Sequence, residues 1–134
     1  MTVDAVRSAA TALVAAFGAH DSEAYFASFA PTSSFVFHNV DHVVTSREAY
    51  ETLWRRWEAD GFQVLGCESS NGAITMLSDE IGVFTHTVRT TVADPADPAG
   101  PLLLGERETI IFQLIDGRWL GVHEHLRIDP TFSV

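Results

Sequence analysis

The chain contains no lysine and only one cysteine, Cys67. A single cysteine excludes a disulfide within the chain and suits a reducing compartment. All eight basic residues are arginines, and eighteen Asp and Glu residues bring the net charge to −10. A field of this sign repels phosphate backbones and anionic membranes, so we expect neither nucleic acid nor a membrane as a partner.

Long hydrophobic runs are absent as well. No apolar stretch approaches the ~20 residues that cross a bilayer. The first residues carry Asp4 in an amphipathic pattern, rather than the basic region and solid apolar run of a signal peptide. We therefore expect one domain, residues 1–134, located in the cytoplasm and large enough to bury a core without disulfides or metal.

The spacing of the apolar residues predicts three helices and a sheet. The helices are expected at residues 3–17, 21–29 and 45–59, and a capping box of Thr45 and Glu48 begins the last one. This order of elements predicts the α+β class, with a mostly antiparallel sheet. Strand patterns cover residues 33–40, 62–69, 73–77, 81–92 and both arms of 102–128, and a proline-rich loop covers 93–101.

The last two strands flank Asp116-Gly117, a strong hairpin signal. A two-residue loop would place Glu108 opposite His125. A three-residue loop, with Gly117 in the left-handed conformation, would instead place Glu108 opposite Glu124. We adopt the three-residue loop because it collects the apolar side chains of the hairpin on one face, namely Ile110, Phe112, Leu114, Leu120, Val122 and Leu126.

Four stretches together resemble the nuclear transport factor 2-like superfamily: LVAAFGAHDSEAYFASFAP, YETLWRRW, DEIGVFTHTVRTT and DGRWLGVHEH. Within it, the chain is similar to SnoaL-like domains and to the association domain of calcium/calmodulin-dependent protein kinase II. The resemblance implies a cone-shaped fold, in which a curved sheet wraps around three N-terminal helices and leaves a central pocket. It also implies a homodimer or a larger homo-oligomer.

The resemblance also assigns residues to the pocket. Of the kinase association domain's pocket residues, a tryptophan carries over to Trp54 and one arginine to Arg89. The other positions differ in this chain and fall on Ser46, Ile110 and Leu126. The tyrosine and aspartate of ketosteroid isomerases fall on Leu13 and, within one residue, on Phe37, which cannot do that chemistry. His38 is adjacent, but a one-residue step along a strand points to the opposite face.

Two glutamates provide the candidate chemistry of this pocket. The adopted hairpin register places Glu108 and Glu124 opposite one another, where both cannot ionise cheaply, so one pKa should be raised unless a cation neutralises the pair. Arg89 is the candidate cation. A purely structural Arg-Glu network is the alternative to a ligand- or proton-handling role. Tyr50 and Trp54 are expected to form the pocket walls.

His123 and His125 share one face of a strand, and His86 has the parity opposite to Arg89. Three imidazoles suffice for zinc, but we favour a hydrogen-bonded dimer interface and expect no metal. The other expected interface residues are Arg107, Thr109 and Trp119.

The leading hypothesis is a self-associating domain whose mostly apolar pocket binds a small organic ligand, anchored by Arg89 and therefore suited to a carboxylate. The alternative is an isomerase, dehydratase or cyclase that uses Glu108 or Glu124 as general base. A pure assembly module is a third possibility. No nucleophile elbow, phosphate-binding loop or dinucleotide fingerprint is present, so no cofactor is expected.

Overall fold

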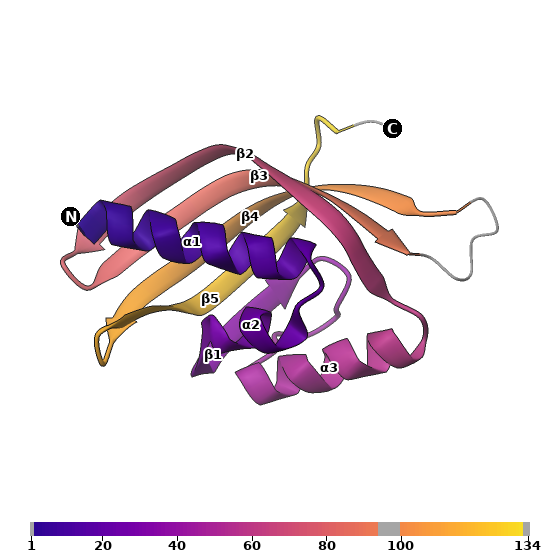
Figure 1. Ribbon diagram of the computed structural model, residues 1–134, viewed down its shortest axis with the longest axis horizontal. Helices are drawn as coiled ribbons and strands as arrows, with labels where there is room; N and C mark the ends of the chain where they lie inside the picture. Colours follow the sequence, from indigo (N-terminus) through magenta and orange to yellow (C-terminus); the bar gives the residue numbers. More distant parts are fainter. Residues whose placement is uncertain (1, 94–99, 133–134) are drawn as a thin grey trace.

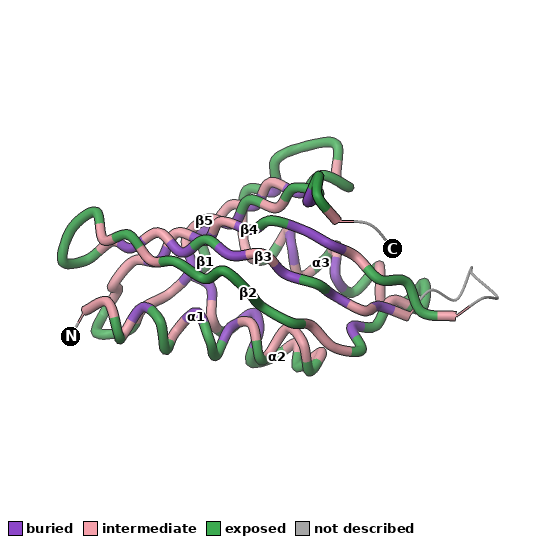
Figure 2. The backbone as a smooth tube through the Cα atoms, turned by 90° about the horizontal axis from the view of Figure 1, so that it is seen from above, coloured by how far each residue is buried: buried purple, intermediate pink, exposed green. Residues whose placement is uncertain are grey.

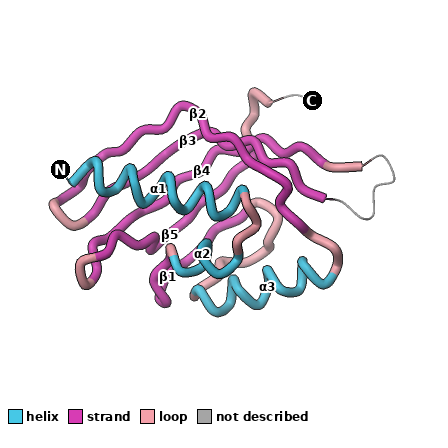
Figure 3. The backbone as a smooth tube through the Cα atoms, in the orientation of Figure 1, coloured by secondary structure: helices cyan, strands magenta, loops and turns pink. Residues whose placement is uncertain are grey.

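The computed structural model describes residues 2–93 and 100–132. These ranges contain three helices and five strands, with the third helix between the first and second strands (Figures 1 and 3). The helices are α1 (Thr2–Gly18), α2 (Ser22–Ala27) and α3 (Arg47–Ala59). The strands are β1 (Phe29–Phe37), β2 (Gln63–Ser78), β3 (Ile81–Ala93), β4 (Leu102–Ile115) and β5 (Arg118–Ile128). No helix in the described ranges is long and apolar enough to cross a membrane.

The strands form one curved, open sheet in the order β1-β5-β4-β3-β2. Only the β1–β5 pair is parallel, and the other pairs are antiparallel. The sheet arches over the helices, with α1 packed against β2 and β3 and with α3 packed against β1 (Figure 1). The α+β class and the mostly antiparallel sheet are therefore confirmed. We call the helix-bearing side of the sheet the inner face and the other side the outer face.

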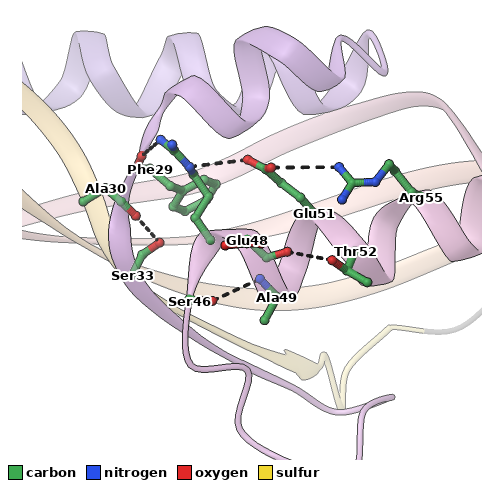
Figure 4. Close-up of polar contacts among 10 residues, drawn as sticks. Phe29, Ala30, Ser33, Ser46, Glu48, Ala49, Glu51, Thr52 and Arg55 are labelled. Atoms are coloured by element: carbon green, nitrogen blue, oxygen red, sulfur yellow. Dashed lines mark hydrogen bonds and ion pairs between the residues drawn. The ribbon is translucent and has the colours of Figure 1, made fainter.

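The helices begin and pack as their sequences require. In α1 the fully buried side chains Val6, Ala10 and Leu13 recur at helical spacing and face the sheet. The predicted capping box at Thr45 is wrong by one residue, because Ser46 accepts the hydrogen bond from the backbone N–H of Ala49 (Figure 4).

Residues 63–78 form one continuous strand, where the sequence predicted two strands, at 62–69 and 73–77, on either side of Asn71-Gly72. Asn71 does adopt a positive φ of 55°, but it does so inside a bulge. The bulge inserts Asn71 and Gly72 into β2 opposite His86 of β3. Bulges often re-aim neighbouring side chains and occur beside functional sites.

The predicted three-residue hairpin loop is wrong. Asp116 and Gly117 alone connect β4 to β5, both with positive φ (50° and 80°), which is the geometry that matches the twist of paired strands. The register then shifts between Gly121 and His123. A Cβ on Gly121 would lie 2.7 Å from the ring of Phe29, so only glycine fits where β5 crosses that ring.

Beyond this shift, Glu124 lies opposite Ile110 and Leu126 lies opposite Glu108. Glu108 and Glu124 are therefore diagonal neighbours rather than a directly opposed pair. Both still point to the inner face. The two-residue loop alone would place them on opposite faces, but the one-residue shift in β5 returns Glu124 to the same face as Glu108.

Candidate functional site

A cavity of about 380 Å³ lies between the helices and the inner face of the sheet. Its walls are mostly apolar and come from all three helices and from four of the strands. The aromatic residues of the lining are Phe17, Tyr25, Phe37, Tyr50, Trp54, Trp57 and Phe62. The aliphatic ones are Leu13, Val14, Val88, Val92, Ala93, Leu104 and Leu126, and the polar ones are Asn39, Asp60, Thr90, Glu106, Glu108 and Glu124.

Tyr50 and Trp54 of α3 lie in this wall, as the sequence predicted. They are only 3% and 1% exposed. The indole N–H of Trp54 donates to Ser22 Oγ at 2.9 Å, which fixes the ring orientation. Trp57, one turn further along α3, packs against the core and lines the cavity as well.

Glu108 and Glu124 lie side by side on the cavity floor, and their carboxyl groups hydrogen-bond to each other. Burial, followed by the charge of Glu108, raises the pKa of Glu124 well above its ordinary value. Burial alone would also raise the pKa of Glu108, but hydrogen bonds from Glu124 and His86 outweigh it and lower that pKa. These directions favour the proton of the pair on Glu124 and the charge on Glu108.

His86 is the neighbour that stabilises this charge. Its Nε2 lies 2.6 Å from Glu108 Oε1, and its Nδ1 lies 2.6 Å from Ser69 Oγ. We had placed His86 on the outer face, and that placement is wrong. Apolar Phe84 and Val88 have the same parity and are buried, so the alternation along β3 could have revealed the inner face (Figure 2).

Arg89, predicted to anchor the ligand, is exposed on the outer face. Its guanidinium lies 5.3 Å from the ring centre of Phe132, near the end of the chain. The prediction fails because a strand alternates its side chains, so Arg89 cannot share a face with the buried Val88 and Thr90. Among the described residues, the cavity lining thus contains no arginine to anchor the predicted carboxylate ligand.

Two tyrosine hydroxyls lie above the carboxyl pair. Tyr25 and Tyr50 hydrogen-bond to each other at 2.9 Å, and the Tyr25 hydroxyl donates to Glu124 at 3.5 Å. Burial raises the pKa of each tyrosine, and the charge that Glu124 carries once it is deprotonated at alkaline pH raises it further, so both hydroxyls stay neutral. Sequence reasoning missed Tyr25, which lies beside Phe26 in an aromatic helix that reads as core.

A second His-Glu pair was also missed. His38 Nε2 lies 2.5 Å from Oε2 of Glu106, which is another residue of the cavity lining. Strand β1 ends at Phe37, so the strand alternation that seemed to turn His38 away no longer applies. Burial raises the pKa of Glu106, although His38 opposes this shift. Leu13 and Phe37, at the ketosteroid isomerase positions, line the cavity without polar groups.

The three histidines considered for zinc do not converge. His86 is on the inner face, whereas His123 and His125 lie on the outer face, where His123 Nδ1 is 2.8 Å from Ser34 Oγ. Within the described ranges, no group of three or more potential ligands could hold a metal ion.

A curved sheet that encloses helices and an apolar cavity is the architecture of cystatin-like and nuclear transport factor 2-like folds, and solved structures of both descriptions resemble this one. The model of the SnoaL-like domain matches residues 6–128. The chain therefore belongs to the SnoaL-like domain family. No curated protein matches it.

Three solved structures illustrate the likeness. A proposed scytalone dehydratase from Novosphingobium aromaticivorans is 15% identical, with a TM-score of 0.79 over 98% of this chain and 88% of that one. A ketosteroid isomerase-like protein from Erwinia carotovora atroseptica is 14% identical, with a TM-score of 0.77 over 92% of each chain. The association domain of Caenorhabditis elegans calcium/calmodulin-dependent protein kinase II is 18% identical, with a TM-score of 0.67 over 92% of each chain. At such identities the likeness shows the fold alone.

Proposed function

We propose that the protein binds a small, mostly apolar molecule in the cavity and moves protons on it, as an isomerase, dehydratase or cyclase of carbonyl compounds does. The observation that supports this most directly is the buried pair of Glu108 and Glu124, whose pKa values move in opposite directions. Titratable groups with pKa values pushed apart are characteristic of acid and base roles in enzymes.

Glu124 is the acid of this scheme, because its raised pKa keeps a proton available for the carbonyl oxygen of a ligand. Glu108 is the base, because it is ionised beside the same cavity. The two roles reinforce each other. When Glu124 turns its proton toward the ligand, Glu108 loses one of the hydrogen bonds that lower its pKa and becomes a stronger base.

The lining also narrows the chemistry of the ligand. Within the described part of the chain it contains four carboxyl groups and no arginine, lysine or histidine. A carboxylate ligand would meet like charge without a partner, so we propose a neutral ligand instead. Thr90 Oγ1 is buried on the cavity wall and has no hydrogen-bond partner among the described residues. A ligand with a polar group next to Thr90 would supply the missing partner.

The proposal can be tested with cyclohex-3-enone, a neutral ketone whose double bond moves into conjugation when a base removes a proton and an acid returns one. The conjugated product is followed by its ultraviolet absorbance. We expect the wild type to accelerate the reaction and Glu108→Gln to lower the rate by ~100-fold or more. Arg89→Ala is the matched control and should retain the wild-type rate, because Arg89 faces away from the cavity.

Two results would contradict the acid-base role. One is a wild-type rate equal to that of buffer, and the other is an unchanged rate in Glu108→Gln. Fluorescence of the neutral dye Nile red then separates the remaining cases. If the dye's fluorescence rises and saturates, the protein binds small molecules without catalysing this reaction. If the fluorescence does not change, the proposal of a ligand in the cavity is wrong as well.

We also propose that the outer face of the sheet pairs with a second copy of the chain. No helix in the described ranges covers this face (Figure 1). Val83, Ile111 and His123 form a half-buried row across it, in register from β3 to β5. The row carries no carboxylate, so two chains of net charge −10 can approach here with little repulsion. A relative of the same fold is described as an association domain.

Light scattering tests this pairing. We expect a dimer that weakens when His123 and His125 are both changed to Ala, while His42→Ala in an exposed loop has no effect. A monomeric wild type at micromolar concentration would end the proposal.

A further inference from the structure

A second hollow, a groove of about 500 Å³, lies between α1 and β2. Its lining includes Cys67, Ser69 and Gly72 of β2 and Phe84 of β3. Val14 of α1 lines both this groove and the central cavity, so the two hollows adjoin each other at this residue. Ser69, one of the hydroxyl-bearing residues of this lining, is exposed to solvent.

One side chain links the two hollows along the inner face of the sheet. The side chain of His86 has no exposed surface, and it contacts Ser69 on one ring nitrogen and Glu108 on the other, each at 2.6 Å. The hydrogen bond between Glu108 and Glu124 extends this chain onto the cavity floor. A continuous series of exchangeable groups therefore runs from the solvent-exposed groove to the carboxyl pair.

The proton positions in this series follow from the donors available. An ionised carboxylate can only accept, so Nε2 of His86 carries the proton that bonds to Glu108. Nδ1 is then free to accept the hydroxyl proton of Ser69. A proton from water can pass through Ser69 to Nδ1 while the Nε2 proton moves to Glu108, and the reverse steps return a proton to water. After one forward and one reverse transfer, the imidazole ring carries the same proton on Nε2 as before.

We propose that Ser69 and His86 form a proton relay that connects the carboxyl pair to the groove between α1 and β2 while a ligand closes the cavity. This rests on the proposed acid-base function and deepens it, since it assigns both residues a role that acts through Glu108. The bulge at Asn71-Gly72 lies directly opposite His86, where β2 departs from regular pairing beside the relay.

The first test compares two nearly isosteric variants. Ser69→Thr keeps the hydroxyl, whereas Ser69→Val replaces it with a methyl group that excludes water from the same position. With cyclohex-3-enone in heavy water, isomerisation reports proton transfer and deuterium in the product reports exchange of the carboxyl pair with solvent. We expect Ser69→Val to reduce deuterium incorporation at least fivefold more than it reduces the isomerisation rate, each measured against the wild type, and Ser69→Thr to match the wild type in both.

Each alternative result overturns the relay. Equal deuterium incorporation in the two variants would show that the proton leaves by another route. A parallel loss of isomerisation and incorporation in Ser69→Val would show that Ser69 only supports the structure. If the wild type incorporates no deuterium into the product, the carboxyl pair does not exchange protons with solvent during turnover.

The second test does not depend on catalysis, so it separates failure of the relay from failure of the proposed function. In protein labelled with nitrogen-15 histidine, the exchange of the Nε2 proton of His86 with water is measured by nuclear magnetic resonance with Nile red filling the cavity. We expect exchange at least tenfold slower in Ser69→Val than in Ser69→Thr. Equal exchange rates overturn the relay even if the enone is turned over, and a tenfold difference supports it even if the enone is not.

Discussion

His86 Nε2 lies 2.6 Å from Glu108 Oε1, and no other histidine contacts this carboxylate in the described part of the chain. The contact explains how a carboxylate remains charged on the floor of an apolar cavity. A buried charge without a donor would cost several kcal/mol, whereas a charge-assisted hydrogen bond offsets much of that cost. His86 thus stabilises the charge of Glu108 and, in the proposed relay, connects that carboxylate to Ser69 in the groove.

Replacing His86 by Phe should therefore destabilise the protein. The ring fits the space, but Glu108 loses a donor and remains buried, so we expect the free energy of unfolding to fall by about 2 kcal/mol or more. Urea denaturation measures the change. His42→Phe, in an exposed loop, is the control and should alter stability by less than about 0.5 kcal/mol. Equal effects of the two substitutions would contradict the role given to His86.

The raised pKa of Glu124 predicts how stability depends on pH. The folded state keeps a proton that the unfolded chain releases above its ordinary pKa of 4.5. The contribution of Glu124 is therefore complete below that pH and declines as the pH rises through the folded pKa, by up to ~1.4 kcal/mol per pH unit. Glu124→Gln, which keeps a donor for Glu108, should be more stable than the wild type at pH 7.5 and similar to it at pH 4.5.

Urea denaturation at a series of pH values measures this difference. Glu23→Gln on the surface of α2 makes the same change in formal charge and serves as the control. A constant difference between Glu124→Gln and the wild type across the range would show that the carboxyl does not hold a proton.

Thr90 offers a prediction that separates stability from binding. Its hydroxyl is buried on the cavity wall without a partner among the described residues. Thr90→Val is nearly isosteric and removes that unsatisfied group, so the free protein should gain about 1 kcal/mol in unfolding free energy. Binding of a neutral ketone should weaken in the same variant. Thr91→Val, of opposite parity on β3, is the control, and a destabilised Thr90→Val would contradict the assignment.

The sequence predicted the parts of the fold that depend on local signals. Apolar periodicity located α1 and α3, and Asp116-Gly117 marked the hairpin. Local signals failed where a distant contact decides the outcome. Asn71-Gly72 suits a turn as well as a bulge, and only pairing with β3 keeps β2 continuous through it.

The candidate site was predicted in part. Tyr50, Trp54 and both glutamates reach the cavity, because parity and helical spacing constrain their directions. Arg89 was placed by resemblance to a distant family, against the alternation of its own strand. The partners of His86 come from two other strands, and sequence spacing cannot reveal such contacts.

The last prediction concerns the register that brings Glu124 to the cavity. The shift in β5 lies beside Gly121, where an added Cβ would lie 2.7 Å from the ring of the fully buried Phe29. Gly121→Ala must move that ring or the strand, so we expect it to lose about 1–3 kcal/mol of unfolding free energy. Gly66→Ala in β2, where a Cβ would meet nothing within 4 Å, is the matched control and should be neutral or slightly stabilising. Equal stabilities of the two variants in urea denaturation would show that the ring does not hold the strand in register.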